Sequence, residues 1–218
     1  MAVNVAISGF GRIGRLVLRS IIESKRKDIN VVAINDLAPV DTNAFLLAND
    51  TVHGPLNEKI SVKKNKMTIG RKTISVLNER DPQKLPWKKM KIDVALECTG
   101  LFTSKEKASM HIKAGAKKVL VSAPCSEADK TIVYGVNEQE ITRNDLVVSN
   151  ASCTTNCLAP VVKVLHEKFG IVHGYMTTIH AFTGDQSVLD TFHPDLRRAR
   201  AASMSMIPTS TGAAKAVG

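Results

Sequence analysis

The stretch "VNVAISGFGRIG", Val3 to Gly14, decides the fold. Its first half, Val3 to Ser8, is a β-branched run that predicts a buried strand ending at a glycine cluster. Apolar residues then recur at helical spacing, which predicts a helix with one apolar face. That face consists of Ile13, Leu16, Val17 and Ile21. A second apolar run, Asn30 to Asp36, completes a strand, helix, strand unit of the length that a right-handed crossover needs.

The glycines of this stretch form a nucleotide-binding pattern. Gly9, Gly11 and Gly14 have the spacing G-x-G-x-x-G, and Asp36 ends the second strand. In this context Gly9 allows a tight turn, Gly11 lets a pyrophosphate approach the backbone, and Gly14 lets the helix pack on the sheet. The helix N-terminus offers N–H groups to phosphate oxygens. Asp36 would accept hydrogen bonds from ribose hydroxyls and repel a 2′-phosphate, which favours NAD over NADP. The alternative is a glycine turn with an incidental aspartate.

Later segments continue the alternation of strands and helices. Antiparallel strands are expected between Ile60 and Leu77, and a helix is expected near Ser104 to Ala114. Further strands are expected in the runs "IDVALECTG", "KKVLVSAP", "TIVYGV" and "LVVSNAS". This pattern predicts an α/β fold in which residues 1–150 form a Rossmann-type domain with a mostly parallel sheet and helices on both faces.

Residues 151–218 differ from this pattern. A helix is expected from the apolar face between Leu158 and Phe169, with Gly170 ending it and Pro160 either kinking it or shifting its start. The run "IVHGYMTTIHAF" then predicts a strand, and residues 183–203 predict a long loop. We expect these residues to belong to an α+β catalytic domain.

Composition excludes several classes of protein. The chain has 218 residues, 44% of them hydrophobic, and it contains no apolar run long enough to cross a membrane. No signal peptide is evident, so a cytoplasmic protein is expected. The formal charge is +10, but the lysines are scattered and aromatic residues make up only 4%, so nucleic acid is not expected as the primary partner. Four cysteines do not suggest a disulfide framework.

The run "SNASCTTNC" holds two of these cysteines. Cys153 lies at a predicted junction of strand and helix, where the helix dipole can stabilise a thiolate. Cys157 is one turn further along and is expected to pack as an inert core residue. His180 ends a predicted strand beside a polar loop, so it is the candidate base. No second pair of ligands supports zinc, and no metal is expected. A hydrolase using cysteine and histidine would explain the thiol but not the glycine pattern.

Motifs along the whole chain carry a resemblance to a known family. They read "GFGRIGR", "NDL", "ERDP", "LPW", "ECTGLF", "SAP", "SNASCTTNC", "TIHAFTGDQ", "DLRRARAA" and "IPTSTGAAKAVG". With these motifs in this order, the chain resembles phosphorylating glyceraldehyde-3-phosphate dehydrogenase. The resemblance implies that Cys153 is the nucleophile that attacks an aldehyde. It also implies that His180 activates this thiol and then serves as acid and base.

The same resemblance implies further binding residues. Cofactor contacts fall on Gly9, Gly11, Arg12, Ile13, Gly14, Asp36, Arg80, Thr99 and Ser122. Ser152, Thr154, Thr211 and Gly212 match positions that bind the attacking phosphate. Thr183 matches a position that binds the substrate's own phosphate, and Arg198 matches an arginine that adds positive charge. NAD-specific members often carry Leu-Pro where this chain has Thr191 and Phe192, which leaves the use of NADP open.

The resemblance implies the oxidative phosphorylation of D-glyceraldehyde 3-phosphate to 1,3-bisphosphoglycerate. The partners would be this aldehyde, inorganic phosphate and NAD, in a homotetramer that residues 183–203 help to form. The family continues beyond the position of Gly218, so we expect 151–218 to be only the N-terminal part of the catalytic domain. Two alternatives stay open: an erythrose-4-phosphate dehydrogenase, which shares the nucleophile motif, and a non-catalytic NAD-binding module, if the chain ends at Gly218.

Overall fold

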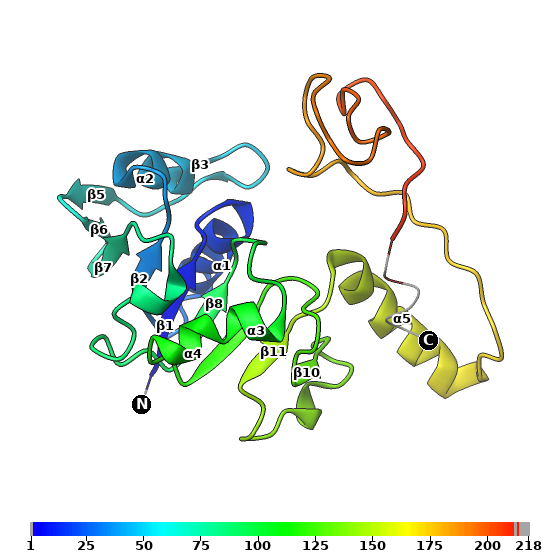
Figure 1. Cartoon of the computed structure of the whole chain (residues 1–218), viewed down its shortest axis with the longest axis horizontal. Helices are drawn as coiled ribbons and strands as arrows, with labels where there is room; N and C mark the ends of the chain where they lie inside the picture. Colours follow the sequence, from blue (N-terminus) through cyan, green and yellow to red (C-terminus); the bar gives the residue numbers. More distant parts are fainter. Residues whose placement is uncertain (1, 212, 214–218) are drawn as a thin grey trace. The chain divides into compact units, whose positions relative to one another are not determined.

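The computed structural model describes residues 2–211 and 213 (Figure 1). These residues divide into two compact units, Met1–Cys153 and Thr154–Gly218, and each is described by itself. The first unit is built around a nine-stranded sheet with the order β10-β11-β9-β8-β1-β2-β7-β6-β5. The strands of this sheet are β1 (Val3–Ser8), β2 (Ile29–Asn35), β5 (Ile60–Lys63), β6 (Lys66–Ile69), β7 (Lys72–Leu77), β8 (Val94–Glu97), β9 (Lys118–Val121), β10 (Lys130–Thr131) and β11 (Val147–Ser149).

The sheet is mostly parallel, as the sequence predicts. β1 lies in the middle and pairs in parallel with β2 on one side and β8 on the other. β9, β11 and β10 extend one half in parallel, and β7 extends the other half beside β2. The pairs β7–β6 and β6–β5 are antiparallel, so within this sheet β6 alone runs against the other strands. A separate two-stranded ribbon joins β3 (Asn49–Asp50) to β4 (Gly54–Pro55).

Helices cover both faces of this sheet. On one face, α1 (Arg12–Glu23) and α2 (Val40–Ala48) pack over a core cluster that contains Ile7 and Ile34. On the other face, α3 (Lys105–Ala108) and α4 (Met110–Lys113) contribute to a cluster around Ala6. Neighbouring residues of β1 therefore point to opposite cores, because side chains alternate along a strand. Two short 3₁₀ helices, Pro82–Lys84 and Glu138–Glu140, lie in the connections.

The second unit contains α5 (Cys153–Phe169), whose first residue closes the first unit. Gly170 follows the helix with φ +70°, as expected of a residue that ends a helix. Pro160 lies inside the helix, so it does not delay the start, which is at Cys153. Within residues 170–211 the structure contains turns and bends but neither a helix nor a strand (Figure 1). The long loop predicted for residues 183–203 is confirmed.

Two strand predictions are wrong. The run 171–182 forms no strand. A strand requires a neighbouring segment to complete its backbone hydrogen bonds, and no described segment pairs with this run. Its side chains Val172, Tyr175 and Ile179 are almost fully exposed. In "TIVYGV" only Thr131 belongs to β10. The rest turns at Gly135, which has φ +81°, and the amide N–H of Asn137 donates to the carbonyl of Val133.

Candidate active site

The glycine loop lies at the carboxyl end of β1 and opens α1, as predicted. Gly9 has φ +86°, and a Cβ built on it would lie 2.5 Å from the backbone nitrogen of Thr99. A Cβ on Gly14 would lie 2.1 Å from the carbonyl oxygen of Gly9, so this residue lets α1 approach the strand end. Above Gly11 there is open space out to 4 Å. The three glycines thus form a cradle beside the first N–H groups of α1, which suits a pyrophosphate.

Asp36 follows β2 and holds the glycine loop in place. The N–H of Phe10 donates to its Oδ2 at 2.6 Å, and the N–H of Ala38 donates to its Oδ1 at 2.8 Å. The Asn43 amide adds a long contact of 3.5 Å to the same Oδ1. A carboxylate has about four lone-pair sites, so these donors still leave acceptor capacity for ribose hydroxyls.

Arg12 is the first residue of α1, and its position depends on an acid that the sequence did not single out. Its guanidinium donates to Oδ2 of Asp50 at 2.9 Å. The N–H groups of His53 and Val52, together with Arg12, lower the pKa of Asp50 to about 2. Asp50 therefore stays ionised and holds Arg12 beside the helix N-terminus. Ile13, the next residue, is half exposed there.

Arg80 lies in the loop after β7, and the end of β2 fixes this loop. The amide side chain of Asn35 donates to the carbonyl of Glu79, and the N–H of Glu79 donates back to Oδ1 of Asn35, both at 2.9 Å. The side chain of Arg80 is exposed. Because Asp36 directly follows Asn35, this pair of hydrogen bonds brings the loop of Arg80 to the same edge of the sheet as Asp36.

The carboxyl ends of β1 and β8 are where the strand order places a bound nucleotide. Chain connections leave β1 toward β2 on one side and reach β8 on the other, and ligands of open α/β sheets bind at the carboxyl ends of strands at such a reversal. Thr99 follows β8 at this edge, and its backbone packs on Gly9. Ser122 follows β9, and its N–H donates to the carbonyl of Glu97 at 3.0 Å. Gly9, Thr99 and Ser122 therefore belong to one edge.

A buried chain of hydrogen bonds fixes the turn that carries Thr99. Nε1 of Trp87 donates to Nδ1 of His111 at 3.0 Å, and Nε2 of His111 contacts Oε2 of Glu97 at 2.9 Å. Oε1 of Glu97 accepts from the N–H of Thr99 at 2.7 Å and from its hydroxyl. The N–H of Leu101 donates to the same hydroxyl oxygen at 3.0 Å.

The indole N–H of Trp87 fixes the proton of His111, and the N–H of Leu101 directs that of the Thr99 hydroxyl. Indole N–H can only donate, so Nδ1 of His111 accepts and Nε2 carries the proton toward Glu97. The Thr99 hydroxyl accepts from Leu101 and directs its own proton to Glu97. Glu97 therefore accepts every hydrogen bond described for its carboxyl group. Glu97, Trp87 and His111 were not predicted as a group from the sequence, because only the fold brings them together.

Cys153 lies at the predicted junction of strand and helix. It is the first residue of α5, and the structure leaves it exposed. Ala151, two residues earlier, is buried and has φ +55°, a left-handed conformation that costs a non-glycine residue about 1 kcal/mol. The Ser149 hydroxyl accepts from the N–H of Ala151 at 3.2 Å and donates to the carbonyl of Ala123 at 2.9 Å. A strained, anchored turn thus delivers Ser152 and Cys153 to the helix N-terminus, where the dipole favours a thiolate.

The other cysteines differ from Cys153. Burial raises the pKa of Cys98 to about 11, against a hydrogen bond with Ser122 that lowers it, so this thiol stays protonated. Burial also raises the pKa of Cys125. The prediction that Cys157 packs in a core is wrong, because this residue is exposed on α5. The predicted apolar face of this helix is itself largely exposed, at Val161, Leu165 and Phe169.

His180 belongs to the second unit and lies in the extended run that forms no strand. Its Nδ1 lies 2.6 Å from the carbonyl oxygen of Ala181. A carbonyl can only accept, so Nδ1 carries a proton in this contact, and a neutral ring then has its lone pair on Nε2. Such a tautomer can take a proton from a thiol through Nε2.

Arg198 joins two predicted phosphate-binding segments within the second unit. Its Nη1 lies 2.6 Å from Oδ2 of Asp185, in the turn that begins at Thr183. Its Nε donates to the Thr209 hydroxyl at 3.0 Å, two residues before Thr211. Arg198 was expected to add positive charge, but Asp185, which the sequence did not single out, offsets that charge. The hydrogen bond from Arg198 also lowers the pKa of Asp185.

The other predicted phosphate-binding residues flank Cys153 or follow Thr209 in the sequence. Ser152 and Thr154, on either side of Cys153, are half buried. Thr211 is exposed, and its hydroxyl accepts from the N–H of Ala213 at 3.2 Å. Gly212 lies outside the described residues. Among residues 2–211 and 213, no group of three acidic, histidine or cysteine side chains is arranged to hold a metal ion. None of the helices described has both the length and the apolar composition needed to cross a membrane.

Comparisons with known proteins agree with this geometry. Residues 3–105 match the family model described as glyceraldehyde 3-phosphate dehydrogenase, NAD binding domain, and residues 152–218 match the model of the same enzyme's C-terminal domain. Curated relatives named glyceraldehyde-3-phosphate dehydrogenase include one from Xanthobacter flavus, 64% identical over the whole chain, and one from Thermotoga maritima, 55% identical over 98% of it. The chain covers 65% and 64% of the lengths of these two relatives, respectively.

Proposed function

Because the chain belongs to the glyceraldehyde-3-phosphate dehydrogenase family and carries its NAD-binding domain, we propose that it takes part in the same reaction. The substrates would be D-glyceraldehyde 3-phosphate, inorganic phosphate and NAD, and the product 1,3-bisphosphoglycerate. The observation that carries this proposal is the strained turn at Ala151, which delivers an exposed Cys153 to the N-terminus of a 17-residue helix. The strand before this turn belongs to the sheet that carries the glycine loop.

The domain division proposed here follows from the same family. Residues 1–150 are assigned to the NAD-binding domain and residues 151–218 to part of the catalytic domain. The start of the second family match at residue 152 and the boundary of the compact units after Cys153 support this assignment.

In the proposed mechanism, His180 takes the proton of the Cys153 thiol, the thiolate attacks the aldehyde carbon, and the imidazolium returns the proton to the aldehyde oxygen to give a hemithioacetal. His180 accepts the proton of the hemithioacetal hydroxyl through Nε2, consistent with a proton on Nδ1. NAD, when bound, supplies the acceptor for the hydride from the former aldehyde carbon. The product on the enzyme is a thioester at Sγ of Cys153. An oxygen of inorganic phosphate then attacks the thioester carbonyl, and the thiolate leaves as the acyl phosphate forms.

Cofactor residues of this mechanism lie at the carboxyl edge of the sheet. The cradle of Gly9, Gly11 and Gly14 would hold the pyrophosphate with Arg12 and Ile13 at the start of α1, and Asp36 would bind the adenosine ribose. Arg80 and Thr99 would contact the adenine side, and Ser122 the ribose next to nicotinamide.

Two anion sites complete the mechanism. Ser152, Thr154, Thr211 and Gly212 would bind the attacking phosphate, and Thr183 would bind the substrate's own phosphate. Arg198 would act by holding the Thr183 turn to the segment before Thr211. Hydroxyl and backbone N–H donors suit these anions because they leave no fixed negative charge beside them.

Assembly and location are part of the proposal. A homotetramer is proposed from the family, and the exposure of Val188, Leu189 and Phe192 within residues 183–203, the loop expected at its interface, supports it. The NAD-binding domain, together with the absence of a disulfide among the four cysteines, all of them described, supports a cytoplasmic enzyme.

Omitting phosphate tests the reaction directly on the native gene product. With D-glyceraldehyde 3-phosphate and NAD but no phosphate, we expect a burst of about one NADH per site, because the thioester accumulates. Added phosphate should restore steady turnover. Erythrose 4-phosphate should give a kcat/KM at least about tenfold lower. Phosphate-independent turnover would refute acyl transfer to phosphate, and a preference for the tetrose would assign the alternative dehydrogenase.

Replacing Asp36 with asparagine tests the cofactor assignment. We expect the Kd for NAD to rise about tenfold and the preference for NAD over NADP to fall, because the amide binds the ribose diol less well and no longer repels a 2′-phosphate. Titration of NAD and NADP by intrinsic fluorescence measures both effects. Asp41→Asn, the same change at an exposed position on α2, is the matched control. Equal effects of the two substitutions would refute the role of Asp36.

A further inference from the structure

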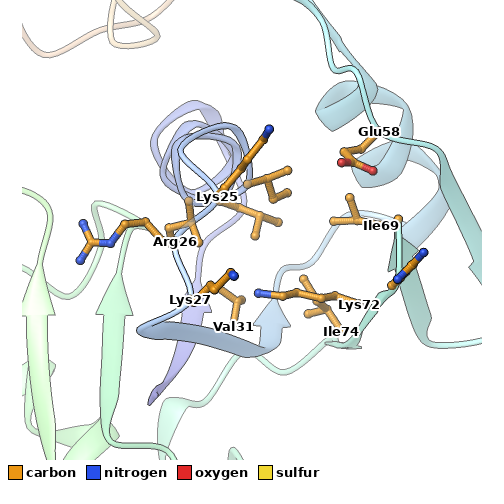
Figure 2. Close-up of a pocket in the computed structure, with 13 residues that line it drawn as sticks. Lys25, Arg26, Lys27, Val31, Glu58, Ile69, Lys72 and Ile74 are labelled. Carbon is orange, nitrogen blue, oxygen red and sulfur yellow. The ribbon is translucent and has the colours of Figure 1, made fainter. Parts of the chain in front are cut away.

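The first unit contains a cavity whose lining includes no residue of the glycine loop (Figure 2). Its volume is about 500 Å³, within the usual range of small-molecule sites. The walls come from the last turns of α1, the link from α1 to β2, and the turn between β6 and β7. These segments include the amino ends of β2 and β7, whereas the cofactor residues follow the carboxyl ends of the parallel strands. The cavity is therefore separate from the proposed NAD site.

Apolar side chains form the inner wall of the cavity. Leu18, Val31, Ile69 and Ile74 belong to the buried core, and their outer surfaces line the space. Ile21 and Ile22 of α1 are only partly buried beside them. Water in contact with this wall is unfavourable, so binding is favoured for an apolar ligand that displaces it.

Cationic side chains surround the opening. Lys25, Lys27, Arg71 and Lys72 line the cavity, and among the described residues none of them forms an ion pair. In Figure 2 the side chains of Lys27 and Lys72 point toward each other. Arg26 points away from the cavity and pairs with Asp28 at 2.5 Å.

A single acid, Glu58, belongs to the lining. Its carboxylate lies against Gly70, where a Cβ would come within 2.6 Å of Oε2. One carboxylate does not balance four cations, so the rim keeps an excess of positive charge.

Lys25 adds an independent observation. It follows the C-terminal end of α1 with φ +53°, the position and conformation that glycine usually takes after a helix. The N–H of Lys25 donates to the carbonyl of Ile22, and the N–H of Arg26 donates to that of Ile21, as in a normal helix end. A lysine here is strained in the backbone, and its ammonium group is placed at the rim.

We propose that this cavity binds a free amphipathic anion, with an apolar body against the isoleucine wall and one carboxylate or sulfonate held by the lysines of the rim. The apolar wall and the excess of cations are the two features that such a molecule requires. The proposal does not depend on the dehydrogenase reaction, and its test measures binding alone.

The probe is 1-anilinonaphthalene-8-sulfonate, an apolar aromatic molecule with one sulfonate, titrated by fluorescence against the full chain. We expect octanoate to displace it. Acetate and octanol should displace it at least about tenfold less well, because acetate lacks the apolar chain and octanol lacks the carboxylate. Saturating NAD should leave the octanoate-sensitive signal unchanged. Displacement by NAD would place the probe in the cofactor site and overturn the proposal.

Charge reversal at the rim is the decisive variant. Lys27→Glu combined with Lys72→Glu should weaken octanoate at least about tenfold, since two attractive charges become repulsive. Lys107→Glu combined with Lys113→Glu makes the same change in net charge on α3 and α4 and should have little effect. Circular dichroism verifies that both double variants fold. Equal affinity in the two double variants would refute the site.

Lys25→Gly separates binding from stability. Glycine relieves the strained backbone, so the melting temperature should rise by about 2 °C. Loss of one rim cation should at the same time weaken octanoate about threefold. A rise in melting temperature with unchanged affinity would contradict a role for Lys25 in this site.

Discussion

Cys153→Ser is expected to lower kcat of the native gene product more than about 10³-fold while changing the Kd for NAD by less than about twofold. A serine hydroxyl is far less acidic than a thiol, so the helix dipole at α5 cannot supply an ionised nucleophile. The cofactor residues of the glycine loop belong to other elements and keep their contacts. Activity is measured by NADH formation, and NAD affinity by fluorescence titration.

Cys157→Ser is the matched control for this substitution. Cys157 lies one turn along the same helix and is also exposed, so the two variants make the same chemical change four residues apart. We expect Cys157→Ser to keep most of the activity, because it lies inside the helix and not at its N-terminus. Retention of even a tenth of the activity by Cys153→Ser would refute the nucleophile assignment. Equal losses in the two variants would show that the assay detects damage to α5 and not the loss of a nucleophile.

Local signals in the sequence were sufficient to predict the elements around the glycine loop. The strand before Gly9, the helix after it and the acid at Asp36 each depend on neighbours in sequence, through side-chain alternation, helical periodicity and the backbone freedom of glycine. The junction at Cys153 was predictable for the same reason. Its strained residue, Ala151, was not, because nothing in an alanine indicates a positive φ.

Features that depend on distant partners were missed or predicted wrongly. Residues 171–182 have the composition of a strand, but a strand forms only where another segment completes its hydrogen bonds. The acid at Asp50 could not be assigned to Arg12 from spacing, since 38 positions separate them. The rim of the cavity combines residues from the link between α1 and β2 with residues from the turn between β6 and β7, which only the fold brings together.

Glu97→Gln is expected to reduce the free energy of unfolding by about 2–4 kcal/mol. Trp87 fixes the proton of His111 on Nε2, so that nitrogen donates toward residue 97, and Thr99 donates twice from the other side. A glutamine has one oxygen and one NH₂ group, so in either orientation its NH₂ faces a donor. Two donors then oppose each other at a site where residue 97 and His111 are buried.

The same substitution should also weaken NAD binding about threefold or more. Thr99 packs against Gly9, so loosening the Thr99 turn disturbs the cradle. Chemical denaturation and NAD titration of the native gene product measure the two effects. Glu106→Gln, on an exposed position of α3, is the matched control and should change neither.

A double-mutant cycle with Trp87→Phe tests whether the fixed proton is the cause. Without the indole N–H, the imidazole can move its proton to Nδ1 and accept from a glutamine at position 97, while the glutamine oxygen accepts from Thr99. Glu97→Gln should therefore cost at least about 1 kcal/mol less in the Trp87→Phe background than in the wild type. Costs that agree within about 0.5 kcal/mol would mean that the two sites act independently. In that case the glutamine would destabilise the core through packing, and the directed chain from Trp87 to Thr99 would not position the cofactor edge.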